Sequence, residues 1–174
     1  MGRRSVREDK NRYQLCREEA GMTRAQASEA LSFISESRLE KIESERTPAQ
    51  PEDVLAMAKA YKSPDLCNYY CTHECPIGRE HVPEVRVRSL SQITLSMLST
   101  LNTLDREKER LIEITEDEHI SGDEMADFAR IQDQLDMISL AVESLKLWVD
   151  RTIASGDLDR EELEKYREKQ ENKQ

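Results

Sequence analysis

The sequence predicts an all-α protein, with a bundle of about five short helices followed by a long antiparallel helical hairpin. The chain has 174 residues and combines 37% hydrophobic with 36% charged residues, which suits amphipathic helices with narrow apolar stripes. One Trp, five Tyr, two Phe and five Gly are too few for a turn-rich β-sandwich. Apolar residues also recur three and four positions apart, which is the helical period.

Composition also restricts the class of protein. No run approaches the ~20 apolar residues that span a bilayer, and the polar, arginine-rich start lacks the apolar core of a secretion signal. We therefore expect a cytoplasmic protein that does not bind membranes. In that compartment the four cysteines are expected to be free thiols or metal ligands rather than disulfides.

The negative charge is concentrated in the second half of the chain. Residues 1–87 hold 14 Lys and Arg against 15 Asp and Glu, whereas residues 88–174 hold 12 against 21. Because binding to duplex DNA depends on neutralising phosphates, only the first half permits a DNA contact. Arg3, Arg4 and Arg7 there form a basic arm that either follows phosphates or is a frayed terminus.

The first two helices are delimited by end signals. Gly21 is a candidate C-terminal cap for the first helix, and Thr23 and Gln26 fit a capping box that opens the second. The predicted inward positions of the first helix are Tyr13, Leu15, Cys16 and Ala20, and those of the second are Ala27, Ala30 and Leu31.

The next two helices follow a short turn. The third runs to about Glu45 and buries Leu39 and Ile42, and Pro51 opens the fourth. The predicted apolar stripe of the fourth helix consists of Val54, Leu55, Ala58 and Tyr61.

Short helices joined by a tight turn, with Ser35 before the third, have the outline of a helix-turn-helix. Over residues 11–63 the sequence resembles the phage-repressor (Cro/Xre-type) helix-turn-helix DNA-binding family. The matching positions are Gly21-Met22-Thr23, Ala27-Ser28, Leu31, Leu39, Ile42-Glu43, Arg46, Pro48 and Leu55-Ala56-Met57-Ala58.

The resemblance implies that the third helix enters the major groove while the start of the second helix contacts phosphates. The implied base and backbone readers are Ser35, Ser37, Arg38 and Lys41, and the implied phosphate contacts are Thr23 and Arg24. The implied function is that of a repressor-like transcriptional regulator that binds specific double-stranded DNA, with no cofactor.

The sequence departs from the family pattern in the turn and in its charge. The turn between Leu31 and Ile42 is one residue longer than usual, Ser32 stands where Gly is common, and Arg24 stands where Gln is frequent. Four acids in or beside the third helix would repel phosphate: Glu36, Glu40, Glu43 and Glu45.

These acids leave two alternatives open. Arg38 and Lys41 either read DNA or pair with neighbouring glutamates on a solvated helix face. The domain as a whole is either a DNA-binding regulator or a protein-interaction adaptor, antitoxin- or inhibitor-like, with weak or no DNA binding. In the second case a protein partner would bind the acidic C-terminal half.

Three cysteines follow Pro64 in a predicted helix over residues 65–75. Cys67 and Cys75 would lie ~12 Å apart on such a helix, too far for one zinc ion, so Cys67, Cys71 and Cys75 are expected to be packing residues rather than metal ligands. The histidines lie beside no nucleophile and carboxylate in a recognisable catalytic arrangement, so we do not expect an enzyme.

The second half of the sequence predicts the antiparallel helical hairpin. Capping boxes at residues 89–92 and 121–124 open its two helices. The predicted contact positions are Leu90, Thr94, Met97, Leu101, Leu104, Lys108, Leu111 and Thr115 in the first helix, and Phe128, Ile131, Leu135, Ile138, Val142, Leu145 and Val149 in the second.

The second helix carries a further apolar stripe that this pairing does not bury. Its residues are Met137, Leu140, Leu147 and Trp148, and we expect either a second chain, in a homodimer, or the N-terminal domain to cover them. The predicted domains are a DNA-binding domain at 1–80, a linker at 81–88, a dimerisation hairpin at 89–156 and a charged, frayed tail at 157–174.

Overall fold

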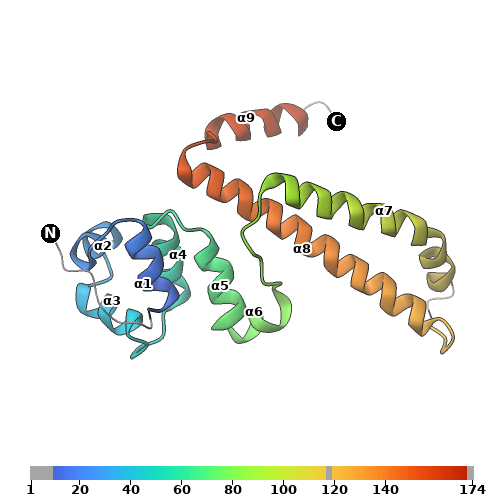
Figure 1. The fold of residues 1–174 in the computed structure, drawn as a ribbon, viewed down its shortest axis with the longest axis horizontal. Coiled ribbons are helices and arrows are strands. Elements are labelled where there is room, and N and C mark those ends of the chain that lie inside the picture. Colours follow the sequence, from blue (N-terminus) through green and yellow to red (C-terminus); the bar gives the residue numbers. More distant parts are fainter. Residues whose placement is uncertain (1–9, 117–118, 172–174) are drawn as a thin grey trace. The chain divides into compact units, whose positions relative to one another are not determined.

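The computed structural model describes residues 10–116 and 119–171, so the basic arm of Arg3, Arg4 and Arg7 lies outside the described residues. The described part is all-α, as predicted, and it contains no strand (Figure 1). Its helices are α1 (Arg12–Glu19), α2 (Arg24–Leu31), α3 (Glu36–Glu43), α4 (Pro51–Ala60), α5 (Asp65–His73), α6 (Pro76–His81), α7 (Leu90–Thr115), α8 (Met125–Ser155) and α9 (Arg160–Glu171).

The chain divides into two compact units. Unit 1 consists of Met1–Val82 and Val149–Gln174, and unit 2 is Pro83–Trp148. The division falls inside α8, and α9, in the predicted tail, is helical with nearly all of its described side chains exposed. Over the described residues, no helix is long and apolar enough to span a membrane.

Helices α1 to α5 enclose the hydrophobic core of unit 1. Leu39 and Ile42 of α3 are buried as predicted, together with Met57 and Leu66. Four positions predicted to face inward are instead exposed: Leu15, Ala20, Ala30 and Leu55. Each of these short helices buries only a narrow arc of its surface. In α1 that arc consists of Tyr13, Gln14, Cys16 and Arg17, and Leu15 lies outside it.

Three end signals predicted for the first helices are confirmed. Gly21 follows α1 with a φ of +71°, a conformation in which glycine has no Cβ penalty. The Thr23 hydroxyl accepts a hydrogen bond from the Gln26 N–H at 3.2 Å, and the Gln26 side chain accepts one from the Thr23 N–H at 2.9 Å. Ser35 caps α3 by accepting from the Arg38 N–H.

The helix predicted over residues 65–75 is shorter than expected. It ends at His73, and Cys75 becomes the N-cap of α6, with Pro76 in its first turn. Gly78 allows α6 to lie against α5, because a Cβ there would stand 2.2 Å from the carbonyl oxygen of Cys71. Over the described residues, no group of three His, Cys, Asp or Glu side chains is arranged to hold a metal ion.

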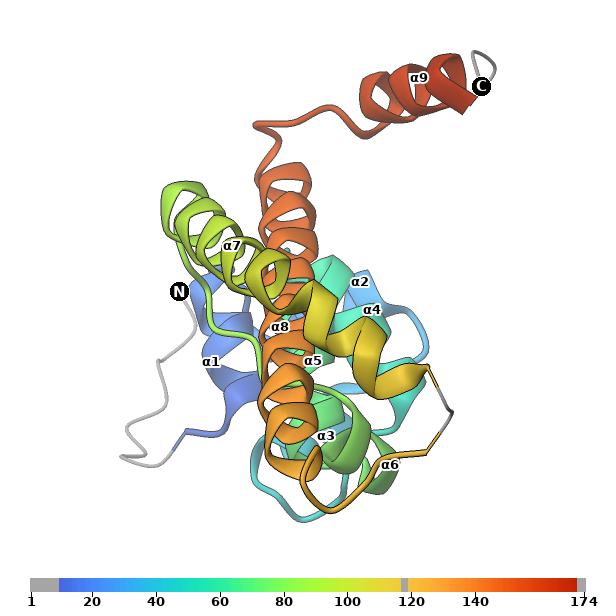
Figure 2. The same ribbon diagram turned by 90° about the vertical axis from the view of Figure 1, so that its right-hand side faces the viewer.

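Helices α7 and α8 pack together and run in opposite directions, side by side in the view of Figure 1 and crossing at an angle in the view of Figure 2. The buried and half-buried side chains between them are Ile93, Met97, Thr100, Leu104, Leu111 and Ile114 of α7 and Ile131, Ile138, Ala141 and Leu145 of α8. Two ion pairs join the helices, Arg110 to Asp127 at 2.8 Å and Arg130 to Glu107 at 2.7 Å.

The predicted contact register of the hairpin is therefore partly wrong. Leu90 and Leu101 of α7 are 41% and 44% exposed, and Leu135 and Val142 of α8 are 46% and 37% exposed. In each helix, the residues that contact the other helix come one position earlier in the sequence than most of these exposed residues. The error arises because each helix has large apolar residues both in the contact positions and in the adjacent stripe, so helical periodicity alone does not show which stripe is buried.

The further stripe of α8, which the sequence predicts to be covered by a second chain or by the N-terminal domain, is largely buried or half-buried in the single chain. Leu147 is only 9% exposed, and Leu140 and Trp148 are half-buried. Met137, at 48% exposed, is the member that remains open to solvent.

Candidate nucleic-acid interface

The turn between α2 and α3 sets the position of the third helix. The Ser28 hydroxyl of α2 donates a hydrogen bond to the Ile34 carbonyl at 2.8 Å, which ties the turn back to the second helix. Ser32 ends α2 with a φ of 55°, in the left-handed region that favours glycine. This geometry explains why glycine is common at the position, and why serine there is a strained substitute.

The turn also exposes an aromatic side chain. Phe33 is 62% exposed and lies two residues before the N-cap Ser35 of α3. Ser37 and Lys41, four residues apart, share the exposed side of α3, and Phe33 lies four residues before Ser37, in the turn that precedes the helix. We call Phe33, Ser37 and Lys41 the recognition ridge.

A buried ion network fixes the C-terminal end of α3 against the neighbouring helices. The Glu43 side chain is 1% exposed and accepts hydrogen bonds from Arg17 at 2.5 and 2.9 Å and from Arg24 at 2.8 Å. Burial of Arg17 disfavours its charge, but hydrogen bonding to Glu43 and the Glu43 charge raise its pKa overall. Glu43 of the Ile42-Glu43 pair therefore joins α1, α2 and α3 rather than facing DNA.

Arg24 is bonded to the same carboxylate as Arg17. Its Nε is bonded to Glu43 and its side chain is 35% exposed, so the guanidinium is held against the domain. Thr23 is exposed, but its hydroxyl and N–H both serve the capping box. Both residues lie at the start of α2, where the resemblance places the phosphate contact.

Arg38 is also held by an acid. Its Nη2 lies 2.5 Å from Oδ2 of Asp53 in α4, and the same oxygen accepts the Gln50 N–H at 3.0 Å. Asp53 is nearly buried, whereas the Arg38 side chain is 38% exposed. The hydrogen bond to Asp53 raises the pKa of Arg38. Arg38 therefore links α3 to α4 and pairs with none of the neighbouring glutamates considered for it.

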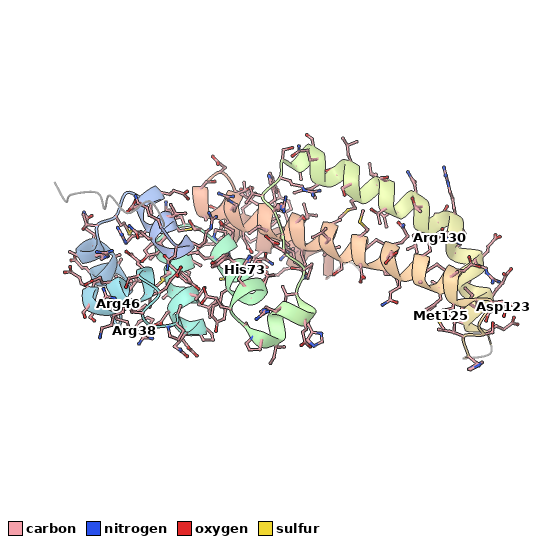
Figure 3. The ribbon with its side chains drawn as sticks, turned by 60° about the horizontal axis from the view of Figure 1, so that its bottom comes forward. Arg38, Arg46, His73, Asp123, Met125 and Arg130 are labelled. Carbon is pink, nitrogen blue, oxygen red and sulfur yellow. The ribbon has the colours of Figure 1, made fainter. Side chains whose placement is uncertain are left out.

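Lys41 differs from both arginines. It is exposed and makes no ion pair with any residue that the structure describes. Nearby, Arg46 pairs with Glu40 at 2.6 Å, with both side chains more than half exposed. Figure 3 shows Arg38 and Arg46 near one another at one end of unit 1. Glu36 is also exposed, so the surface around the ridge carries both signs of charge.

Sequence reasoning missed two features of this surface. The exposure of Phe33 was not anticipated, although the extra residue in the turn was the available signal. The acid partners of the arginines lie 15 to 26 residues away in the chain, as Asp53 does from Arg38 and Glu43 does from Arg17. Helical periodicity contains no information about contacts at that separation.

Comparison with known proteins supports the resemblance. Residues 14–70 match a family model described as a helix-turn-helix domain, of the Xre/Cro-like kind. No curated protein and no solved structure matches the chain. At the coarse level, a domain of this kind indicates a DNA-binding regulator.

Proposed function

Because residues 14–70 form a helix-turn-helix domain, we propose that this protein regulates transcription by binding specific double-stranded DNA through α3. The observation that carries the proposal is the recognition ridge, which combines an exposed aromatic side chain in the turn before α3 with an exposed hydroxyl and lysine four residues apart on α3. The proposed role is not catalytic.

The ridge offers the chemistry that reads base edges. A phenylalanine ring contacts the methyl group of thymine, a serine hydroxyl donates or accepts at several bases, and a lysine binds guanine or phosphate. The other side of α3 is fixed by Leu39 and Ile42, which are 0% and 2% exposed. A reading helix with so rigid a support loses little conformational freedom on binding.

Arg24 and Arg38 have a second role in this proposal. Each is already bonded to an acid of the domain, so each positions a helix and offers its remaining N–H groups to phosphate. The exposed Glu36 and Glu40 weaken non-specific attraction to phosphates. We therefore expect the protein to bind DNA of arbitrary sequence weakly. A large part of its affinity for a specific site should then come from contacts with the bases.

A second candidate function rests on the same acids. A helix-turn-helix adaptor that binds a protein would need no positive surface, and Glu36 and Glu40 beside the ridge favour that alternative. The strongly acidic residues 88–174 would suit a basic partner. The two functions differ in whether the chain enriches a DNA sequence.

Selection from a pool of random duplex DNA tests the proposal. The full chain should enrich a defined motif, and Lys41→Ala should lower affinity for that motif with a salt slope smaller by about one if Lys41 contacts phosphate. Lys59→Ala is the matched control, since Lys59 is exposed on α4 outside the ridge. Recovery of no motif by the folded wild-type chain would contradict DNA reading and favour the adaptor.

A further inference from the structure

Unit 1 contains a pocket of about 380 Å³ between the start of α1, the segment that follows α3 and the end of α5. Its volume lies in the range of small-molecule sites. Its lining includes the rings of Tyr13, Tyr69 and His73 and the carboxylates of Glu45 and Glu74. Among the described residues that line it there is no lysine or arginine. We call it the acidic pocket.

Three rings form an aromatic wall of the acidic pocket. Tyr69 and His73, one turn apart on α5, stack with ring centroids 4.5 Å apart, and the ring of Tyr13 lies at 83° to that of Tyr69, with centroids 6.1 Å apart. A ring nitrogen of His73 also lies 3.1 Å from the Tyr69 carbonyl oxygen. The wall is therefore held in place by the protein itself, and aromatic rings attract cations.

Two carboxylates of the acidic pocket have unused hydrogen-bonding capacity. Oε1 of Glu74 accepts the Tyr13 hydroxyl at 2.7 Å. Within the described part of the chain, the side chain of Glu45 and the second oxygen of Glu74 accept no hydrogen bond and form no ion pair. Burial and then the charges of Glu74 and Glu45 raise the pKa of Tyr69, against the opposing charge of Arg12, so both carboxylates act on the aromatic wall.

The backbone of Glu45 is in an unusual conformation. Glu45 follows α3 with a φ of 59°, in the left-handed region where glycine is the usual residue after a helix and other residues are strained. The Ile42 carbonyl accepts the Glu45 N–H at 3.0 Å and Nδ2 of Asn11 at 2.8 Å, which fixes this segment to the start of α1. Glycine would meet the backbone requirement without strain, so the fold itself does not require this carboxylate.

We propose that the acidic pocket binds a small organic cation, a protonated amine or a guanidinium compound with an apolar body. Glu45 and Glu74 would pair with the positive charge, and the aromatic wall would contact both the charge and the body. An anion would be repelled by the two carboxylates. A metal ion is disfavoured, because no group of three His, Cys, Asp or Glu in the described residues is arranged to hold one.

An NMR titration of the ¹⁵N-labelled full chain with phenethylamine tests the proposal. This probe is a protonated amine at neutral pH, and phenethyl alcohol is its uncharged counterpart with the same aromatic body. Phenethylamine should shift amide signals of residues 11–13, 42–49 and 69–74 with a Kd of about 1 mM or below. Phenethyl alcohol should bind at least about fivefold more weakly, because it cannot pair with the carboxylates. The titration contains no DNA, so its result is separate from that of DNA reading.

Variants of Glu45 assign the binding to the pocket. Glu45→Gln removes the charge at an exposed position and should weaken phenethylamine binding by about three- to fivefold. Glu45→Gly should weaken it similarly while it keeps or raises the melting temperature, since glycine relieves the strained φ. Glu29→Gln is the matched control, because it removes the same charge from an exposed position of α2 outside the pocket, and it should bind like the wild type.

Three results would overturn the proposal. The first is the absence of saturable shifts in the pocket residues with phenethylamine up to about 10 mM. The second is equal binding of phenethyl alcohol, which would make the site apolar rather than cation-selective. The third is an equal effect of Glu45→Gln and Glu29→Gln, which would mean that the cation is attracted only by the net charge of −10.

Discussion

Replacing Glu43 by Gln should destabilise unit 1 far more than the small change in shape suggests. The Glu43 carboxylate accepts three hydrogen bonds from two arginines, and its side chain is 1% exposed. Glutamine keeps the length but removes the charge, so Arg17, whose side chain is 7% exposed, is left as a buried cation whose remaining acid partner is Glu18 at 4.0 Å.

The expected loss is ~3 to 5 kcal/mol, the usual cost of breaking a buried ion pair by removing one partner. Glu40→Gln is the matched control, because the pair of Glu40 with Arg46 is more than half exposed and should contribute only ~0 to 1 kcal/mol. Glu43→Gln and Glu40→Gln thus make the same chemical change on one helix at two depths.

Urea unfolding followed by circular dichroism measures both variants. For a slope of ~1 to 2 kcal/mol per molar urea, Glu43→Gln should lower the midpoint of unit 1 by at least ~1.5 M. A double variant, Arg17→Met with Glu43→Leu, should recover part of the loss because no buried charge remains. Equal midpoints for Glu43→Gln and Glu40→Gln would refute the view that this network supports α3.

Three further predictions concern unit 1. Gly78→Ala should cost ~1 to 3 kcal/mol in thermal unfolding, because the new Cβ would meet the Cys71 carbonyl; an unchanged transition would contradict that close approach. Burial raises the pKa of the Cys67 and Cys71 thiols, so alkylation near neutral pH should be slow until urea is added, and metal analysis should find no stoichiometric zinc or iron. Phe33→Ala should abolish any preference for thymine over uracil in a selected duplex, and an unchanged preference would remove Phe33 from the reading surface.

Local signals predicted much of unit 1. Thr23 with Gln26, Gly21 and Ser35 mark helix ends through hydrogen bonds within a few residues, so they can be read in order along the chain. The order and type of the first helices followed from such signals, and the family resemblance followed from their spacing. Pairing of Arg38 with Asp53 depends on how α3 and α4 pack, and no local pattern encodes it.

In the hairpin, too, the sequence predicted the helices but not which of their side chains contact each other. Helical periodicity located α7 and α8, but two adjacent apolar stripes on each helix fit the period equally well. Thr100 lies in the contact and Leu101 lies outside it, against the order of their hydrophobicity. The choice is made by how the partner helix fits, which requires both helices in place.

The central claim, that α3 reads a DNA sequence, is tested most directly by fluorescence anisotropy. A selected duplex and a scrambled duplex of equal composition would be titrated with the full chain at two salt concentrations. We predict at least ~10³-fold tighter binding to the selected duplex at physiological salt, and loss of most of that ratio in Ser37→Ala combined with Lys41→Ala. Equal affinity of the wild type for both duplexes would contradict the account.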